Sequence, residues 1–177
     1  MQIRSAKDLI VYQKAYRILG HSAGWVYLVI VLDWFTEKVV GWEISLRGRS
    51  REWRQAMYVA LERRGFRGSG LKLISGNGSQ LTSVSFMREM GTLGIEQIFT
   101  SYDNPQGNAE TERMLRTIEE EIIWLDGFSS FEEAREKIGR WIDGDYNKLY
   151  VHSLLGYRSP EDFEEQSGEQ NSAKEAA

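Results

Sequence analysis

A run of β-branched and aromatic residues, Trp25–Asp33, constrains the fold of this chain more than any other segment. The run is too short for a typical helix and indicates a strand that is buried in a core. The polar Thr36-Glu37-Lys38 follows and can turn the chain. Val39–Ser45 then has the composition of a returning strand, so the two segments predict a hairpin.

Helical and strand patterns alternate along the rest of the chain. Apolar residues at helical spacing predict one helix from Ser50 to near Gly65 and a shorter one from Ser83 to near Gly91 or Gly94. Two further strands and two further helices are predicted over 71–75, 95–100, about 108–125 and about 130–146. A strand hairpin followed by this alternation predicts a mixed α/β sandwich.

The composition is that of a soluble globular chain, and it excludes several classes of protein. A length of 177 residues with a 41% hydrophobic share predicts one domain with a real core. The absence of cysteine excludes a disulfide framework and thiolate metal sites, and it fits the reducing cytoplasm, where we expect the protein. The longest apolar run, Val26–Leu32, is far too short to span a bilayer, so no membrane partner is expected. The net charge of −4 argues against broad nonspecific DNA binding, which requires Lys and Arg to neutralise phosphates.

Two positions point to a site at one edge of the predicted sheet. Gly76-Asn77-Gly78 follows the strand 71–75 directly, and open sheets bind ligands at the carboxyl ends of their strands. Glu112 stands in the first turns of a later helix. The glycine-rich stretch lacks the spacing and the lysine of a phosphate loop.

A series of short motifs follows the chain from about Gly24 to Phe163. They are Gly24-Trp25-Val26-Tyr27-Leu28, Leu32-Asp33, Lys38-Val39-Val40-Gly41-Trp42, Ser79-Gln80-Leu81-Thr82-Ser83, Asn108-Ala109-Glu110-Thr111-Glu112, Tyr146-Asn147, His152-Ser153 and Leu155-Gly156-Tyr157-Arg158-Ser159-Pro160. In this order they resemble the integrase catalytic core of insertion-sequence DDE transposases, a branch of the retroviral-integrase-like superfamily. The resemblance implies an α/β, ribonuclease H-like mixed sheet flanked by helices.

In that family three carboxylates hold two Mg²⁺ ions for phosphoryl transfer. The resemblance assigns the third carboxylate to Glu112 and the second to position 76, which is glycine here. Because 112 − 76 = 36, thirty-five residues lie between them, which is the spacer that the resemblance leads us to expect. The same resemblance gives four candidate DNA contacts, Asn77, Gln80, Asn108 and Arg116.

The first carboxylate is also missing from its expected place. Counting back from Gly24 gives Lys14 as the approximate position. The segment Lys7–Tyr16 resembles the opening helix of small four-helix-bundle proteins linked to intervening sequences in ribosomal RNA genes. We therefore expect the first strand of the core to be altered or replaced, unless these residues form the strand regardless. The chain then divides into an atypical N-terminal segment (1–20) that is a candidate fused helix, an integrase-type core (21–164) and a disordered polar tail (165–177).

A single carboxylate holds a hard divalent cation poorly, so we expect a catalytically inactive transposase core with no cofactor. If any residue binds a metal, it is Glu112. One alternative is a module that binds DNA weakly, or that pairs with itself or a related transposase and regulates transposition. A basic groove would favour DNA, and its candidate residues are Arg47, Arg49, Arg51, Arg54, Arg63, Arg64 and Lys72. The other alternative is an active strand transferase in which Asp8, Asp33 or Asp103 rebuilds the metal site.

Three further residues have simpler interpretations. Asp33 ends a predicted strand and is expected to be a turn or cap residue. His152 lies in the C-terminal motif and is expected to be a half-buried structural histidine. Glu119 shares a helical face with Glu112 and Arg116 and begins an acidic run that would repel a DNA backbone.

Overall fold

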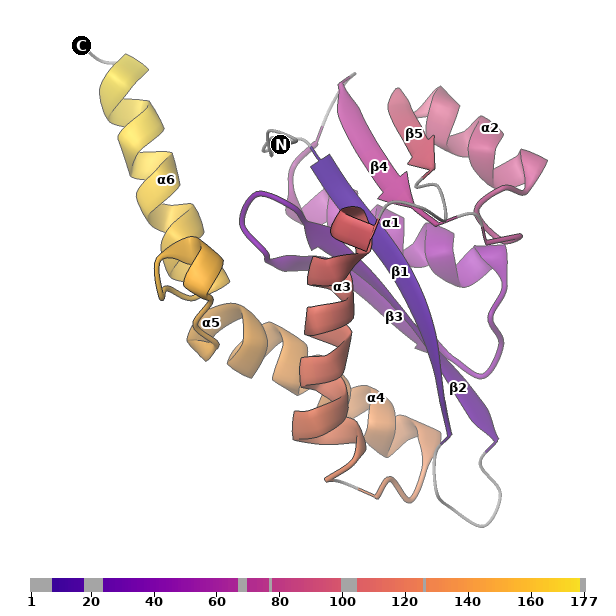
Figure 1. Cartoon of the computed structure of the whole chain (residues 1–177). Helices are drawn as coiled ribbons and strands as arrows, with labels where there is room; N and C mark the ends of the chain where they lie inside the picture. The colour runs from indigo at the N-terminus through magenta and orange to yellow at the C-terminus, as the bar shows by residue number, and fades with distance from the viewer. Residues whose placement is uncertain are drawn as a thin grey trace.

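The computed structural model describes residues 8–17, 24–66, 70–76, 78–99, 105–125 and 127–175, leaving out the side chains of 105–111 and 169–175. Its centre is a five-stranded sheet in the order β3-β2-β1-β4-β5 (Figure 1). The strands are β1 (Asp8–Arg17), β2 (Trp25–Asp33), β3 (Val39–Ser45), β4 (Leu71–Ser75) and β5 (Ile95–Phe99). The first three strands pair antiparallel, whereas β4 and β5 run parallel to β1. The mixed sheet confirms the predicted fold class.

Residues 8–17 form the central strand of the sheet, so of the two alternatives for this segment the strand is confirmed and the candidate fused helix is wrong. β1 pairs with β2 along nearly its whole length and with β4 over four residue pairs, the last of which is Val11↔Ser75. Its side chains alternate between two cores, with Val11 in one and Tyr16 in the other. Pairing on both edges and burial on both faces outweigh the helical spacing of its apolar residues.

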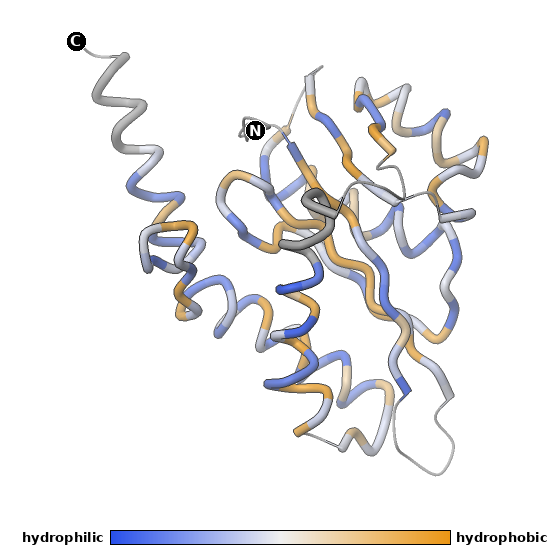
Figure 2. Tube along the Cα trace, in the orientation of Figure 1, coloured by the Kyte–Doolittle hydropathy of each residue, from blue (hydrophilic) through white to orange (hydrophobic). Residues whose placement is uncertain are grey.

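Helices cover both faces of the sheet (Figure 1). One face packs against α1 (Ser50–Arg63) and α2 (Val84–Thr92). The other face packs against α3 (Pro105–Ile118), its continuation η1 (Glu119–Ile123), α4 (Phe131–Arg140) and η2 (Trp141–Tyr146). Hydrophobic residues are concentrated along the strands between these two layers (Figure 2). The strands and helices predicted between residues 25 and 146 are confirmed, with each of the last two helices divided into an α and a π part.

The C-terminal segment contains α5 (Asn147–Leu149), η3 (Ser153–Leu155) and α6 (Pro160–Glu175). α6 thus continues past residue 165, where the sequence predicts a disordered tail, and ends at Glu175. Ser159 caps α6, because its Oγ accepts a hydrogen bond from the Asp162 backbone N–H at 3.2 Å. Pro160 occupies the first position of α6, where proline is favoured in helices. None of the helices in the described ranges combines the length and apolarity needed to cross a membrane.

Candidate functional site

The candidate site lies where β4 ends beside the middle of β1. The parallel register of the two strands ends at Val11↔Ser75, so Gly76 follows on beside Tyr12. Tyr12 is half-buried and packs against the core beneath α3 and α4. No sequence signal singled out Tyr12, because its place beside Gly76 depends on pairing between residues 75 − 11 = 64 positions apart.

Gly76 is not required by the backbone at this position. A Cβ atom built on it meets no heavy atom within 4 Å. Its φ angle lies outside the left-handed region in which glycine is favoured. The fold therefore accepts a side chain here, including the aspartate that the family resemblance leads us to expect.

Glu112 is exposed on α3 and lies near the level of these two positions. β1 and α3 run in the same sense (Figure 1), and the Lys14 ammonium forms an ion pair with the Glu119 carboxylate. Glu112 precedes Glu119 by seven residues, or about 10 Å of helix. About three strand residues span that distance, which leads from Lys14 back to the level of Val11, the neighbour of Tyr12. Tyr12, Gly76 and Glu112 thus lie at nearly the same level of the sheet and of α3.

Lys14, expected near the first carboxylate, lies two residues beyond Tyr12 on β1. Its ion pair holds the start of η1 against the sheet, and Glu119 is only 8% exposed. The Glu119 carboxylate thus faces inward and is neutralised, whereas Glu120 and Glu121 of the same acidic run are exposed, so the predicted repulsion of a DNA backbone by this run stays a prediction. Burial, and then the nearby Glu119 carboxylate, raise the pKa of the neighbouring Tyr16 hydroxyl, which stays neutral.

Asp33 is a structural residue, as expected from the sequence. Its Oδ1 accepts hydrogen bonds from the backbone N–H groups of Phe35 at 2.8 Å and Thr36 at 3.0 Å. Its Oδ2 lies 2.7 Å from the Arg64 Nη2. Both oxygens are thus engaged in closing the turn after β2 and tying it to the end of α1.

The donor atoms that the structure brings together do not fit a two-metal centre. Tyr12, Gly76 and Glu112 offer one carboxylate, whereas each hard divalent cation takes about six oxygen ligands. Asp8 lies four strand residues from Tyr12, or about 13 Å along β1. Within the described ranges no cluster of three or more His, Cys, Asp or Glu side chains is arranged to hold a metal ion. Asp103 falls outside those ranges.

The candidate DNA contacts are only partly described. The Gln80 Nε2 donates to the Gly48 backbone oxygen at 3.2 Å, so it ties the loop after β4 to the loop before α1. Arg116 is exposed on α3. Asn77 and the side chain of Asn108 lie outside the described residues.

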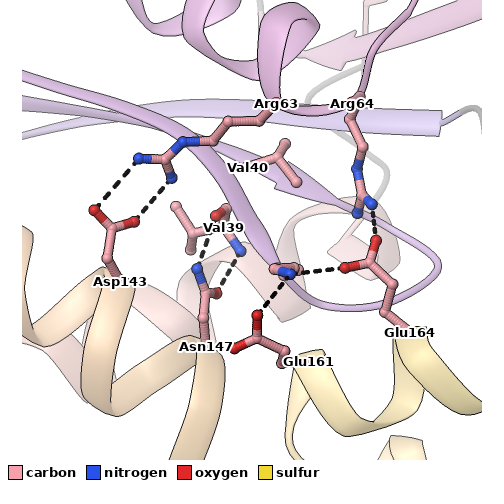
Figure 3. A pocket seen from close by; sticks show the side chains of 9 residues that line it. Val39, Val40, Arg63, Arg64, Asp143, Asn147, Glu161 and Glu164 are labelled. Carbon is pink, nitrogen blue, oxygen red and sulfur yellow. Dashed lines mark hydrogen bonds and ion pairs between the residues drawn. The ribbon is translucent and has the colours of Figure 1, made fainter.

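The basic residues of α1 divide between its two ends and do not form one groove. Arg63 and Arg64, at the C-terminal end, line a pocket of about 430 Å³ beside α6 (Figure 3). Every cation of this pocket is paired, through Arg63–Asp143, Arg64–Glu164, Lys38–Glu161 and Lys38–Glu164. The Lys38 and Arg64 pairs dock α6 against the β2–β3 hairpin and the end of α1, whereas the Arg63–Asp143 pair ties α1 to η2, so the charges of Arg63 and Arg64 are already compensated.

The other end of α1 keeps its positive charge. Arg47, Arg49 and Arg51 are exposed, and within the described residues none of them forms an ion pair. Arg54, one turn further along, pairs with Glu89 at 2.7 Å. About 20 Å of helix separates this cluster from the ion pairs at the other end of α1.

Comparison with known families matches nearly the whole described core. A family model described as an integrase core domain matches residues 13–105, and a second model of the same description matches residues 93–160. The transposase of insertion sequence element IS904 from Lactococcus lactis is 32% identical over 141 residues, covering 80% of this chain and 55% of the relative. Transposase InsF of IS3fB from Escherichia coli is 29% identical over 149 residues, covering 84% and 51%. The chain thus spans about half the length of these curated relatives.

Solved structures show the same fold at low sequence identity. The catalytic core domain of BIV integrase aligns with a TM-score of 0.63 at 15% identity, covering 94% of this chain and 99% of that one. A chain of the simian T-cell lymphotropic virus intasome in complex with PP2A regulatory subunit B56 gamma aligns with a TM-score of 0.68 at 17% identity, covering 88% and 52%. The catalytic domain of Mos1 mariner transposase aligns with a TM-score of 0.63 at 13% identity, covering 78% and 71%.

Proposed function

The chain belongs to the integrase core domain family, and on this premise we propose that it is a transposase-type catalytic core without a working metal centre. It is an integrase- and transposase-core-like protein of DNA transposition. We infer that Tyr12 and Gly76 occupy the positions of the first two carboxylates of the family. Glu112 retains the third.

One observation carries this proposal: the strand register that places Tyr12 beside Gly76. A tyrosine and a glycine supply no carboxylate between two metal ions that must sit about 4 Å apart. Glu112 alone contributes at most two oxygens. The residues present therefore do not fit the pair of Mg²⁺ ions that the family uses, and no chemical step is assigned to this chain.

The direct test is a strand-transfer assay on a processed-end oligonucleotide in Mg²⁺ or Mn²⁺. We expect the unchanged chain and its Glu112→Ala variant to give the same background, because Glu112 has no partner carboxylate to act with. An active transposase assayed in parallel shows that the substrate is competent. Strand transfer by the unchanged chain that Glu112→Ala abolishes would refute the proposal and favour a rebuilt site.

A second candidate function is a DNA-binding module that modulates a related transposase, alone or as a homo-oligomer. The exposed cluster of Arg47, Arg49 and Arg51 favours it, because Gln80 joins this loop to the loop that follows Gly76. The cluster could therefore contact phosphates of DNA lying across the candidate site. With three free cations on a chain of net charge −4, such binding is expected to be weak.

Substituting Arg47 and Arg51 together by glutamine is expected to weaken duplex binding and flatten its salt dependence. Each phosphate contact that is lost lowers the slope of log K against log salt by about 0.9, so the double variant should lose up to about 1.8. A gel shift at several salt concentrations measures this slope. Lys148→Gln, an exposed substitution on α5, is the control and should leave the slope unchanged. Equal slopes for both variants would exclude this arginine cluster as the contact.

A further inference from the structure

A second cavity opens beside α3, next to the core residues Met114 and Tyr146. It has a volume of about 290 Å³ and is walled by α3, the β2–β3 turn and the segment from η2 to residue 157. Its lining residues are Glu37, Arg113, Met114, Thr117, Tyr146, Tyr150, Val151, His152, Ser153 and Tyr157. That volume lies at the lower limit of ligand pockets and suits one small planar group.

One wall of the cavity is aromatic and rigid. The rings of Tyr146 and Tyr150 stack with their centroids 5.9 Å apart, and the His152 ring meets their edges at 5.2 and 5.4 Å. The Tyr146 hydroxyl donates to the Glu37 backbone oxygen at 3.2 Å, which fixes the wall to the β2–β3 turn. Tyr146 is itself only 1% exposed, so this packed cluster forms the back of the cavity, and the exposed ring of Tyr157 is the face on which a planar group can stack.

His152 lines the cavity, and one of its ring nitrogens has no hydrogen-bond partner among the described residues. The residue is only 9% exposed, and its Nε2 is buried with no hydrogen-bond partner in the described part of the chain. Burial, followed by the charge of Arg113, lowers the pKa of His152, so the imidazole is neutral at physiological pH. A neutral imidazole without a partner is costly to bury and favours a ligand with a polar edge.

Tyr157 is held over the cavity by a strained turn. Its φ is +59°, directly after Gly156 with φ +66°, and a non-glycine residue rarely adopts that conformation. Hydrogen bonds between Tyr157 N–H and the His152 oxygen at 2.9 Å, and between His152 N–H and the Arg158 oxygen at 3.0 Å, hold the turn in place. The ring is nevertheless 77% exposed. Strain of this kind is typical of residues that clamp a ligand.

We propose that this cavity receives one unpaired nucleobase of a DNA end, stacked against Tyr157, with its polar edge toward His152 and its phosphate on Arg113. The Arg113 side chain is exposed and adjoins Glu112 in sequence, so a strand that reaches the candidate site can pass over it. An aromatic face accepts any base, and the guanidinium accepts the phosphate of the same nucleotide. The choice of a DNA end as the partner rests on the proposed function as a transposase-type core. The binding of a nucleotide in the cavity does not depend on that proposed function.

The pocket is tested first with free dAMP, monitored through the imidazole NMR signals of His152. We expect dAMP to shift these signals in the unchanged chain and in Tyr157→Phe, which keeps the ring. Tyr157→Ala and Arg113→Gln should reduce the shift. Trp124→Ala removes an exposed aromatic ring outside the pocket and should have no effect. Unshifted His152 signals in the unchanged chain at millimolar dAMP would overturn the proposal.

The DNA arm uses a duplex with an unpaired 2-aminopurine overhang and a blunt duplex of the same sequence. Stacking should quench the fluorescence of the overhang, and Tyr157→Ala should weaken overhang binding about 5- to 100-fold with little effect on the blunt duplex. Equal affinities for the two duplexes, or an unaffected Tyr157→Ala variant, would overturn the DNA-end role. If no duplex binds but dAMP still shifts His152, the pocket is supported and the DNA-contact part of the proposed function fails.

Discussion

Tyr12→Asp combined with Gly76→Asp is expected to create a divalent-cation site where the unchanged chain has none. The two aspartates would stand side by side on β1 and after β4, facing Glu112 from α3. Position 76 is open to a side chain, so this substitution should cost little stability. At a Mn²⁺ concentration about 100 times the dissociation constant, binding adds about 2.7 kcal/mol to the unfolding free energy. That corresponds to a rise of roughly 5–11 °C in Tm for a chain of this size.

DNA-nicking activity should appear together with metal binding in the double variant. A catalytic cation is worth several kcal/mol, so metal-dependent nicking of a supercoiled plasmid should rise about a hundredfold or more over the unchanged chain. The matched controls are Gly76→Asp alone and the double variant carrying Glu112→Ala, each of which lacks at least one of the three carboxylates. A double variant that folds but shows neither the Tm rise nor calorimetric heat with Mn²⁺ would contradict the placement of Tyr12 beside Gly76.

The fold could be predicted from the sequence wherever the apolar residues of a strand or helix recur with one clear spacing. The run at Trp25–Asp33 and the helix from Ser50 are of this kind. β1 could not be predicted from the sequence. A central strand is buried on both faces, so it loses the two-residue alternation of apolar and polar side chains that marks a half-buried strand. The helical spacing of Tyr12 and Tyr16 then gave the stronger but false signal. α6 was missed for a different reason: it has no apolar stripe, and ion pairs from distant residues hold it.

The candidate site, like the fold, could be predicted from the sequence only in part. Glu112 and Gly76 were identified because local motifs and their spacing carry a family resemblance. Tyr12 required the register between two strands, which depends on contacts distant in sequence. Whether the basic residues form the groove that would favour DNA binding could not be predicted either, for the same reason. The carboxylate that neutralises Arg63 lies 143 − 63 = 80 positions away, beyond the reach of any local pattern.

The glycine in the motif Lys38-Val39-Val40-Gly41-Trp42 is explained by packing, and it gives the largest stability effect that we expect from a single substitution. β3 approaches α1 so closely that a Cβ built on Gly41 would lie 2.2 Å from the Ala56 backbone oxygen and 2.9 Å from the Ala60 Cβ. Both helix positions are already small and fully buried. The clash is with backbone, so no side-chain rotation can relieve it, and the helix itself must move.

Gly41→Ala is therefore expected to lower the unfolding free energy by about 3 kcal/mol or more, at the upper end of the cost of overpacking a core. In a chain of this size that is a fall of roughly 6–12 °C in Tm, measured by thermal unfolding. Gly91→Ala is the matched control, since its Cβ meets nothing within 4 Å and alanine is the better helix former. Gly91→Ala should thus be neutral or mildly stabilising. Equal Tm values for the two variants would show that α1 does not pack on β3 as closely as these distances require.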